Sequence, residues 1–500
     1  MSNLATQIPL RPVLPQVLNN VDYHRREQEL RRMDELLRLS GAEQEFQAAY
    51  MAKWLGEKPE SIFGADQILK QEARSRRALR CVILMSMFSE SYREMSVRLA
   101  ECPLYQWFCE LDHLGGIMVP SKSELGRFVK IVDAPVLRDV NDQLIAMAAK
   151  PGTEDTDQVL GLKNEIELST VWMDSTALKA NIHFPVDWVL LRDATVTLMK
   201  ATDLIRKHGI KHRMAEPKGF IKAMNSLSMQ MTSVRRKPDS KRSRKKVFRS
   251  MKKVIQTVKE HALRHRDLLE KGWQETDWSE AQAAQVIGRI DNVIGQLPEA
   301  IKQGHERIIG NRKVKNSEKI LSLYESEVDV IVRGKASAEI EFGNSLLLAE
   351  QKQGLIVDWK LHQQSAPNDS NQVQECVERV EASQGKGVVE AVVGDRQFES
   401  KANKKWLEAQ GIYNALCPRS VEELKNKSKS AKFQDLQRRR AQTEARIAIL
   451  KNEFLGNPLK RKGFKNRERQ VGWSVLAHNL WVLARLEVAD ELSEPLAAAA

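Results

Sequence analysis

The chain has 500 residues, of which 42% are hydrophobic and 29% charged, and its formal net charge is +13. These values are typical of a globular protein with about two to four domains, and the excess of positive charge indicates a polyanionic partner. No run of about 18 apolar residues predicts a membrane span, and the N-terminus lacks the pattern of a secretory signal peptide. The five scattered cysteines include no C-x-x-C pair, which argues against a zinc ribbon or a disulfide framework and favours a reducing, cytoplasmic setting.

Residues 1–150 are predicted to form a helical N-terminal region. Two capping boxes mark helix starts, at Ser91–Glu94 and at Ser121–Glu124. The two segments around them suit a DNA-binding helix-turn-helix, whose second helix would present three basic residues to DNA: Lys122, Arg127 and Lys130. An ordinary helical bundle explains the pattern equally well, so both interpretations stay open.

A strand and a long insertion are predicted next. The β-branched apolar run at 164–176 predicts a strand that ends at Asp174, and residues 177–335 then become polar and helical in pattern. This predicted helical insertion contains a basic run, 235–253, with eleven basic residues and one acid. Such a run is expected to meet DNA phosphates, with a solvated loop as the alternative. The candidate contacts are Arg235, Arg236, Lys241, Arg242, Arg244, Lys245 and Lys246.

Strand-like sequence resumes at residue 336 and alternates with helices up to residue 485. Lys352-Gln353-Gly354 joins two strands as a hairpin, and the continuous apolar run GVVEAVVGD predicts a buried strand that ends at Asp395. Without the insertion, the predicted order is β-β-β-α-β-α-β-α. Three strands in a meander followed by alternation is the plan of a ribonuclease H-like mixed sheet. We therefore predict this α/β fold for 164–176 with 336–485, followed by a flexible tail at 486–500.

The late helix RRRAQTEARIAILKNEF (438–454) carries Arg440, Glu444 and Lys451 on one face. A row of solvated salt bridges is the ordinary explanation. However, arginine before glutamate is the weaker orientation of an i,i+4 pair, and Lys451 lies about 10 Å along the helix from Glu444. A metal-binding carboxylate between cations that bind phosphates fits this row better. Glu453, on the opposite side of the helix, remains a rival for the acidic role.

Asp174, Asp395 and Glu444 are thus three candidate acids on separate elements. Two-metal phosphoryl transfer needs carboxylates that converge from separate elements and hold two cations about 3.5–4 Å apart. Mg²⁺ suits this chemistry because it keeps positions open for water and substrate phosphates. If the strands and the late helix pack as predicted, the three acids form a candidate metal centre.

Three motifs together resemble those of the DDE transposases of bacterial insertion sequences, including the group that insertion-sequence schemes leave unclassified. They are WMDST (172–176), VVGDRQF (392–398) and R-x₃-E-x₆-K (440–451). The resemblance extends over roughly residues 80–485, since PSKSELGRF (120–128) and GFKNRERQVGWSVLAHNLWVLARL (463–486) are also similar. Many relatives carry a tyrosine where this chain has Gln437, so the DNA contact of that tyrosine is not expected here.

The resemblance implies an enzyme that hydrolyses a phosphodiester at each transposon end and joins the freed 3′-OH to target DNA. It implies that Asp174, Asp395 and Glu444 bind two Mg²⁺ or Mn²⁺ ions, and that Arg440 and Lys451 contact DNA. A homodimer or larger assembly is expected, because two ends must be held together. Two alternatives stay open: a metal-dependent nuclease on the same fold without strand transfer, and a DNA-binding protein whose catalytic fold is inactive.

Other polar residues carry weaker signals. His183 and Asp187 follow Asp174 closely, and a loop brace is the favoured role for them. The pair His261 and His265 has the i,i+4 spacing of metal ligands but lacks a third ligand nearby, so a solvated helix face is expected. Asp358 is expected to lie on the polar face of its strand.

Overall fold

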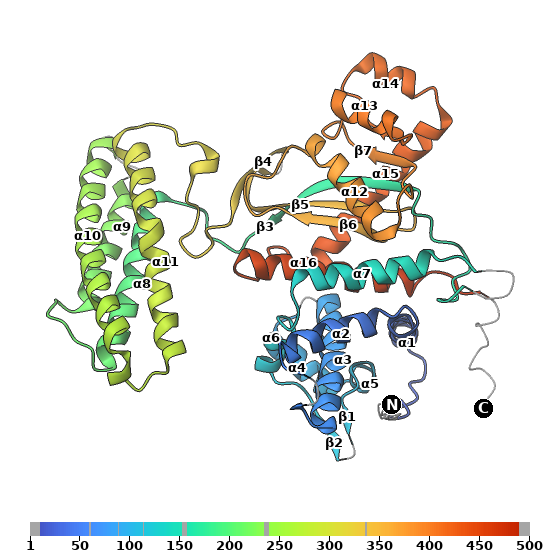
Figure 1. Cartoon of the computed structure of the whole chain (residues 1–500). Coiled ribbons are helices and arrows are strands. Elements are labelled where there is room, and N and C mark those ends of the chain that lie inside the picture. The colour runs from blue at the N-terminus through green and yellow to red at the C-terminus, as the bar shows by residue number, and fades with distance from the viewer. Residues whose placement is uncertain are drawn as a thin grey trace. The chain divides into compact units, whose positions relative to one another are not determined.

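A computed structural model describes residues 11–59, 62–88, 90–113, 115–152, 158–234, 240–335 and 338–489. The chain divides into two compact units (Figure 1). The first contains Met1–Leu178, Ser345–His362 and Ala366–Ala500, and the second contains Lys179–Asn344 and Gln363–Ser365. Arg235 and Arg236, as well as most of the predicted tail, lie outside the described residues. Within the described part of the chain, no helix has the length and hydropathy needed to cross a bilayer.

The first unit begins with a group of helices and one short hairpin. The helices are α1 (Val21–Leu39), α2 (Ala42–Leu55), α3 (Ala65–Phe88), α4 (Tyr92–Glu101), α5 (Pro103–Cys109), α6 (Lys122–Phe128) and α7 (Ala134–Ala149); the hairpin is β1 (Asp112–His113) with β2 (Gly116–Ile117). Ser91 and Glu94 form both halves of the predicted capping box at α4. Ser121 caps α6 by accepting a hydrogen bond from the Glu124 amide.

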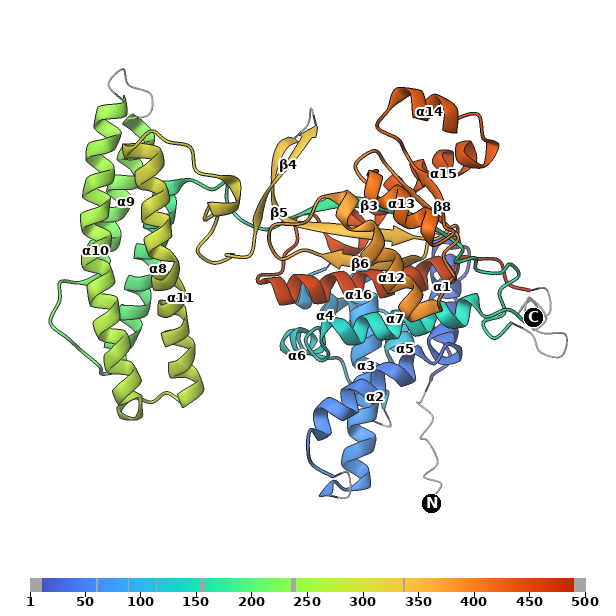
Figure 2. The ribbon, with the colours of Figure 1, turned by 45° about the horizontal axis from the view of Figure 1, so that its top comes forward.

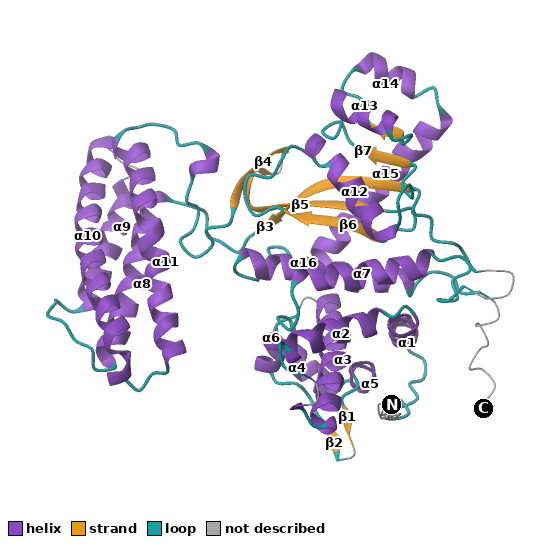
Figure 3. Ribbon diagram, viewed as in Figure 1, coloured by secondary structure: helices purple, strands orange, loops and turns teal. Residues whose placement is uncertain are grey.

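A mixed sheet forms the second part of this unit (Figure 3). Its strands lie in the order β6-β5-β3-β7-β8: β6 (Ile356–Leu361), β5 (Ala338–Glu350), β3 (Thr170–Lys179), β7 (Ala391–Gly394) and β8 (Tyr413–Leu416). β5 and β6 are antiparallel, whereas β7 is parallel to both β3 and β8. The α/β class, the mixed sheet and the hairpin after β5 are as predicted, and the strand order is compatible with a ribonuclease H-like fold.

The helices that follow the strands complete the unit. They are α12 (Val373–Gln384), α13 (Lys401–Ala409), α14 (Val421–Lys427), α15 (Ala431–Ile449), a π-helical continuation (Leu450–Leu455) and α16 (Phe464–Leu483). α16 is buried along most of its length and contacts α1, α3, α7 and β6. One hydrophobic core therefore joins the N-terminal helices to the sheet, with Trp473 of α16 among its largest buried side chains.

The first strand differs from its prediction. It was expected at 164–176 with Asp174 at its end, but β3 covers Thr170–Lys179 and Asp174 lies in its middle. The strand continues because Ala177 and Leu178, beyond the acid, are also buried. The pairing of β3 with β7, in contrast, ends near Asp174: its last pair is Trp172 of β3 with Val393 of β7.

The second unit contains four helices that lie side by side (Figures 1 and 2). They are α8 (Asp187–Lys207), α9 (Pro217–Val234), α10 (Ser240–Gly272) and α11 (Glu280–Gly304). Their apolar faces form a separate core, to which α11 contributes the stripe Val286, Ile290, Val293 and Leu297. β4 (Asp329–Lys335) pairs with the first half of β5 in the same unit. The insertion was predicted at 177–335; the unit begins after Leu178 and includes this hairpin.

Candidate active site

Asp174 lies in β3, and Asp395 directly follows β7, the neighbouring parallel strand. The register pairs Trp172 with Val393, so two residues further on the same register places Asp174 opposite Asp395. The two acids thus lie directly beyond the last paired residues of β3 and β7, where the strands begin to separate. The Asp174 carboxylate accepts a hydrogen bond from the Ser175 amide (2.8 Å), and that of Asp395 accepts one from the Gln397 amide (2.7 Å).

The pKa of Asp174 reports the charges around its carboxyl group. Burial is the largest effect and raises this pKa to about 6. The hydrogen bond from Ser175 and the positive charge of Arg440 lower it, while the negative charges of Asp395 and Glu444 raise it. Both other predicted acids and the predicted arginine are thus close enough to act electrostatically on Asp174.

Glu444 itself is largely exposed. Its side chain is 60% accessible and forms an i,i+4 ion pair with Arg440, with 3.0 Å between Oε1 and Nη1. The described residues contain no group of three or more His, Cys, Asp or Glu side chains arranged closely enough to hold a metal ion. The three acids therefore share one electrostatic environment without forming a closed ligand set.

Lys451 contacts the strand that carries Asp174. Its ammonium group donates to the Thr176 hydroxyl (3.1 Å) and to the carbonyl of Ala177 (2.8 Å). Glu453, the alternative candidate for the third acid, lines a pocket on the other side of the helix together with Arg26 and other residues of α1. The two sides of the helix thus face different surroundings, and the side with Lys451 faces β3.

One buried carboxylate fixes α15 against the sheet. Glu350, at the end of β5 and only 4% exposed, accepts hydrogen bonds from Arg439 (2.6 Å) and from the Thr443 hydroxyl (2.7 Å), and Arg446 lies 3.5 Å away. The Arg439 guanidinium also lies over the ring of Trp172, 4.7 Å from its centroid. Because these three partners of Glu350 recur at helical spacing, one anion holds two turns of the helix that carries Glu444.

Gln437, which stands where many of the similar transposases have a tyrosine, has a structural role. Its amide nitrogen donates to the carbonyls of Ala415 (2.6 Å) and Gly394 (3.2 Å), at the ends of β8 and β7. Gly394 directly precedes Asp395. Gln437 therefore ties the first half of α15 to the strand end that carries the second acid.

Two expectations about other residues are wrong. Asp358 is not on a solvated face: it is fully buried and pairs with Arg138 and Arg379, each at 2.7 Å. His265 is also fully buried; its Nδ1 bonds the His261 carbonyl at 2.8 Å, because α10 turns this side towards the core of its unit. A hydrophobicity pattern cannot reveal the pairing of Asp358 with Arg138, because Arg138 comes from a distant part of the chain.

Asp187 has the bracing geometry that was favoured for it. It is the first residue of α8, is 5% exposed, and accepts hydrogen bonds from Gln303 and Arg307, both at 2.8 Å. Its carboxylate thus ties the start of α8 to the end of α11 and to the turn after it. These contacts lie within the second unit, and none involves a predicted acid of the candidate active site.

The predicted DNA contacts lie on exposed surfaces. Lys122, Arg127 and Lys130 are exposed on and just after α6, which contacts α4. Residues 102–121 between these helices hold α5 and the short hairpin instead of a simple turn. On α10, Lys241, Arg242 and Lys246 are exposed, Lys245 is half-buried, and the Arg244 guanidinium lies 5.3 Å from the ring centroid of Trp188.

A comparison with known protein families finds a match for part of the chain. Residues 344–480 match the family described as "Transposase DDE domain". No curated protein and no solved structure matches the chain. The matched residues include Asp395 and the R-x₃-E-x₆-K motif, whereas Asp174 lies before them. The match over residues 344–480 confirms the resemblance to the DDE-type transposases of insertion sequences.

Proposed function

We propose that the chain is an insertion-sequence transposase that cuts the element's ends by metal-dependent hydrolysis and joins each freed 3′-OH to target DNA. The observation that supports this most directly is the surroundings of Asp174, where two further carboxylates and one guanidinium act on a half-buried acid. Three carboxylates face the guanidinium of Arg440 and the ammonium group of Lys451 beside β3, so the carboxylates outnumber the cations. This is the charge pattern that a divalent cation site needs.

The donor set fits Mg²⁺ or Mn²⁺, the class of ion that transposases of this family use. Asp174, Asp395 and Glu444 would hold two such ions. When bound, these ions supply an activated attacking oxygen and stabilise the leaving oxygen. Asp174 and Asp395 are fixed by adjacent strands, whereas Glu444 is exposed and would have to exchange its pairing with Arg440 for the cations.

The remaining residues of the site serve the DNA. Arg440, once released from Glu444, and Lys451, held beside β3, would bind the phosphates that flank the reacting one. The exposed cations of α6 and α10 would hold the duplex through its backbone, which positions the DNA without reading its sequence. In this proposal the sheet and its helices are the ribonuclease H-like catalytic fold, the α8–α11 unit is the basic insertion, and two or more copies hold the two ends together.

The test uses purified protein, a duplex from the flank of its own gene, and Mg²⁺ or Mn²⁺. Glu444→Gln keeps the size of the side chain and removes its charge, and Glu453→Gln makes the same change on the opposite side of the helix. We expect the wild type and Glu453→Gln to nick at one position and join the 3′ end to other DNA. Glu444→Gln should bind the duplex equally well and do neither.

Each other outcome rejects a defined part of the proposal. Cleavage by Glu444→Gln at the wild-type rate would show that Glu444 is a surface acid paired with Arg440. Cleavage without joining would identify a nuclease. If the wild type binds the duplex but never cuts it with either metal, the chain is a DNA-binding protein with an inactive catalytic fold.

A further inference from the structure

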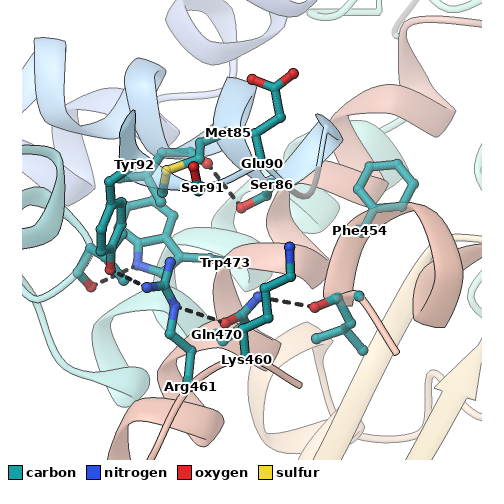
Figure 4. A pocket seen from close by; sticks show the side chains of 14 residues that line it. Met85, Ser86, Glu90, Ser91, Tyr92, Phe454, Lys460, Arg461, Gln470 and Trp473 are labelled. Atoms are coloured by element: carbon teal, nitrogen blue, oxygen red, sulfur yellow. Dashed lines mark hydrogen bonds between the residues drawn. The ribbon is translucent and has the colours of Figure 1, made fainter. Parts of the chain in front are cut away.

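A cavity of about 230 Å³ lies between the N-terminal helices and the segment that precedes α16 (Figure 4). Tyr92 and Ser91 enter it from the start of α4, Lys460 and Arg461 enter from the C-terminal segment, and Trp473 of α16 closes one side. All of these residues belong to the first unit. None of them belongs to the candidate active site.

Arg461 is the unusual member of this lining. Its guanidinium lies over the Tyr92 ring, 4.3 Å from the centroid, and donates to the Tyr92 hydroxyl and to Oε1 of Gln470 (3.1 Å). Both partners are neutral, and within the described residues no carboxylate pairs with Arg461. Burial lowers the pKa of this guanidinium, and only Tyr92 opposes the effect. Arg461 is thus a partly buried cation without a carboxylate partner among the described residues, and Glu90, the acid that also lines this cavity, pairs with Arg98 instead.

Arg485 shows what the usual arrangement looks like. It also lies over an aromatic ring, that of Trp481 at 4.4 Å, but it is paired with Glu29 at 3.2 Å. A buried charge without a partner is costly, so an uncompensated guanidinium facing a cavity indicates that an anion belongs there. Two of the five N–H groups of Arg461 are used, which leaves three that can donate to such an anion.

The residues that line the cavity indicate which class of anion it can bind. A guanidinium fork matches the paired oxygens of a phosphate, and the hydroxyls of Tyr92 and Ser91 can donate as well. The half-buried ring of Tyr92 offers an apolar wall suited to a base or sugar, whereas Trp473 is only 1% exposed and closes the cavity. Trp473 is held in place by a hydrogen bond from its Nε1 to the Val129 carbonyl (3.1 Å). A cavity of this size admits a group that protrudes at a strand end, not the middle of a duplex.

We propose that this cavity binds a terminal phosphate of a nucleic acid strand, with Arg461 as the phosphate-binding residue and Tyr92 as a wall for the attached nucleotide. The choice of a strand end as the source rests on the proposed function. The phosphate chemistry itself rests on the cavity alone. A free nucleotide or inorganic phosphate would offer the same group, and the experiment separates these sources.

The experiment is isothermal titration of the full chain with a short single strand that carries a 5′-phosphate and with the same strand ending in a 5′-OH. AMP and inorganic phosphate are titrated in parallel. The phosphorylated strand should bind about tenfold more tightly or better, as expected for charge-assisted hydrogen bonds. Arg461→Gln should remove this difference, and the matched control Arg485→Gln should retain it. Tyr92→Phe, which keeps the ring and removes the hydroxyl, should reduce the difference and provides the test if Arg461→Gln does not fold.

Equal affinity of the wild type for both strands would overturn the proposal, as would a phosphate preference that survives in Arg461→Gln or is unchanged in Tyr92→Phe. Tight binding of AMP or inorganic phosphate, at the level of the strand, would reject the strand end as the source. These measurements need no catalysis. Failure of the Glu444 test therefore leaves the result interpretable, and failure here leaves the proposed chemistry at Asp174 untouched.

Discussion

Replacing Glu350 by glutamine is expected to loosen α15 on the sheet. The variant removes the only acidic side chain that pairs with Arg439 or Arg446 in the described structure, while the Arg439 side chain is only 12% exposed. Breaking a buried ion pair from one side costs about 3–5 kcal/mol, because the other charge stays buried. Arg439 keeps the carbonyls of Gln351 and Lys352 as acceptors, which favours the lower end of this range.

Hydrogen exchange of the α15 amides measures this effect locally. A loss of about 3 kcal/mol in the free energy of opening corresponds to exchange that is roughly 10²-fold faster. The matched control is Glu423→Gln, because Glu423 pairs with Lys404 at 2.9 Å on an exposed surface, where such a pair contributes at most about 1 kcal/mol. If α15 exchanges at the wild-type rate in Glu350→Gln, Glu350 does not hold the helix.

Three further predictions concern charges elsewhere in the chain. The Mg²⁺ requirement of DNA cleavage should rise as pH falls through about 6, because the ion competes with a proton for Asp174, whose pKa lies there; a requirement that is flat from pH 8 to 5.5 would contradict this. Burial raises the pKa of Asp142 to about 7, so the ionised carboxylate destabilises the folded state and stability falls as the pH rises towards 7. Asp142→Asn should therefore raise the melting temperature at pH 8, and it should raise it less at pH 5. Replacing the exposed cations of 241–246 by glutamine should weaken DNA binding and flatten its salt dependence by about 0.9 log unit per lost phosphate contact, whereas a helix face that only meets solvent would leave the slope unchanged.

The elements of the fold could be predicted because each carries a local pattern. The apolar run before Asp395, the hairpin at Gly354 and the stripe on α11 all follow from side-chain periodicity and turn chemistry. The end of β3 was misplaced because an acid in a strand resembles an acid that ends one. Only the pairing with β7, which is not local, shows that Asp174 lies where the two strands separate.

The three candidate acids could be chosen from sequence motifs, whereas the residues that hold their elements in place could not. Asp174, Asp395 and Glu444 come from recognisable motifs, and their mutual influence appears in the pKa of Asp174. Glu350 and Gln437 have no motif of their own, because their partners lie about 90 and 20 residues away in the sequence and meet only in the folded chain. Asp358 was misread for the same reason, since Arg138 lies more than 200 residues before it.

Because Arg440 pairs with Glu444, replacing Arg440 is expected to strengthen metal binding and to weaken DNA binding. In this structure the guanidinium holds the carboxylate that the proposed ions need, so arginine and metal compete for Glu444. Arg440→Gln removes that competitor and a positive charge that lies near Asp174. At pH 8, where Asp174 is ionised, the variant should bind Mn²⁺ more tightly in the absence of DNA, as titration calorimetry can measure. It should also bind DNA ends more weakly, because it lacks a phosphate contact. A variant that binds Mn²⁺ no better than the wild type would mean that Arg440 and the ions do not share Glu444, and the ordinary surface salt bridge would then describe this pair fully.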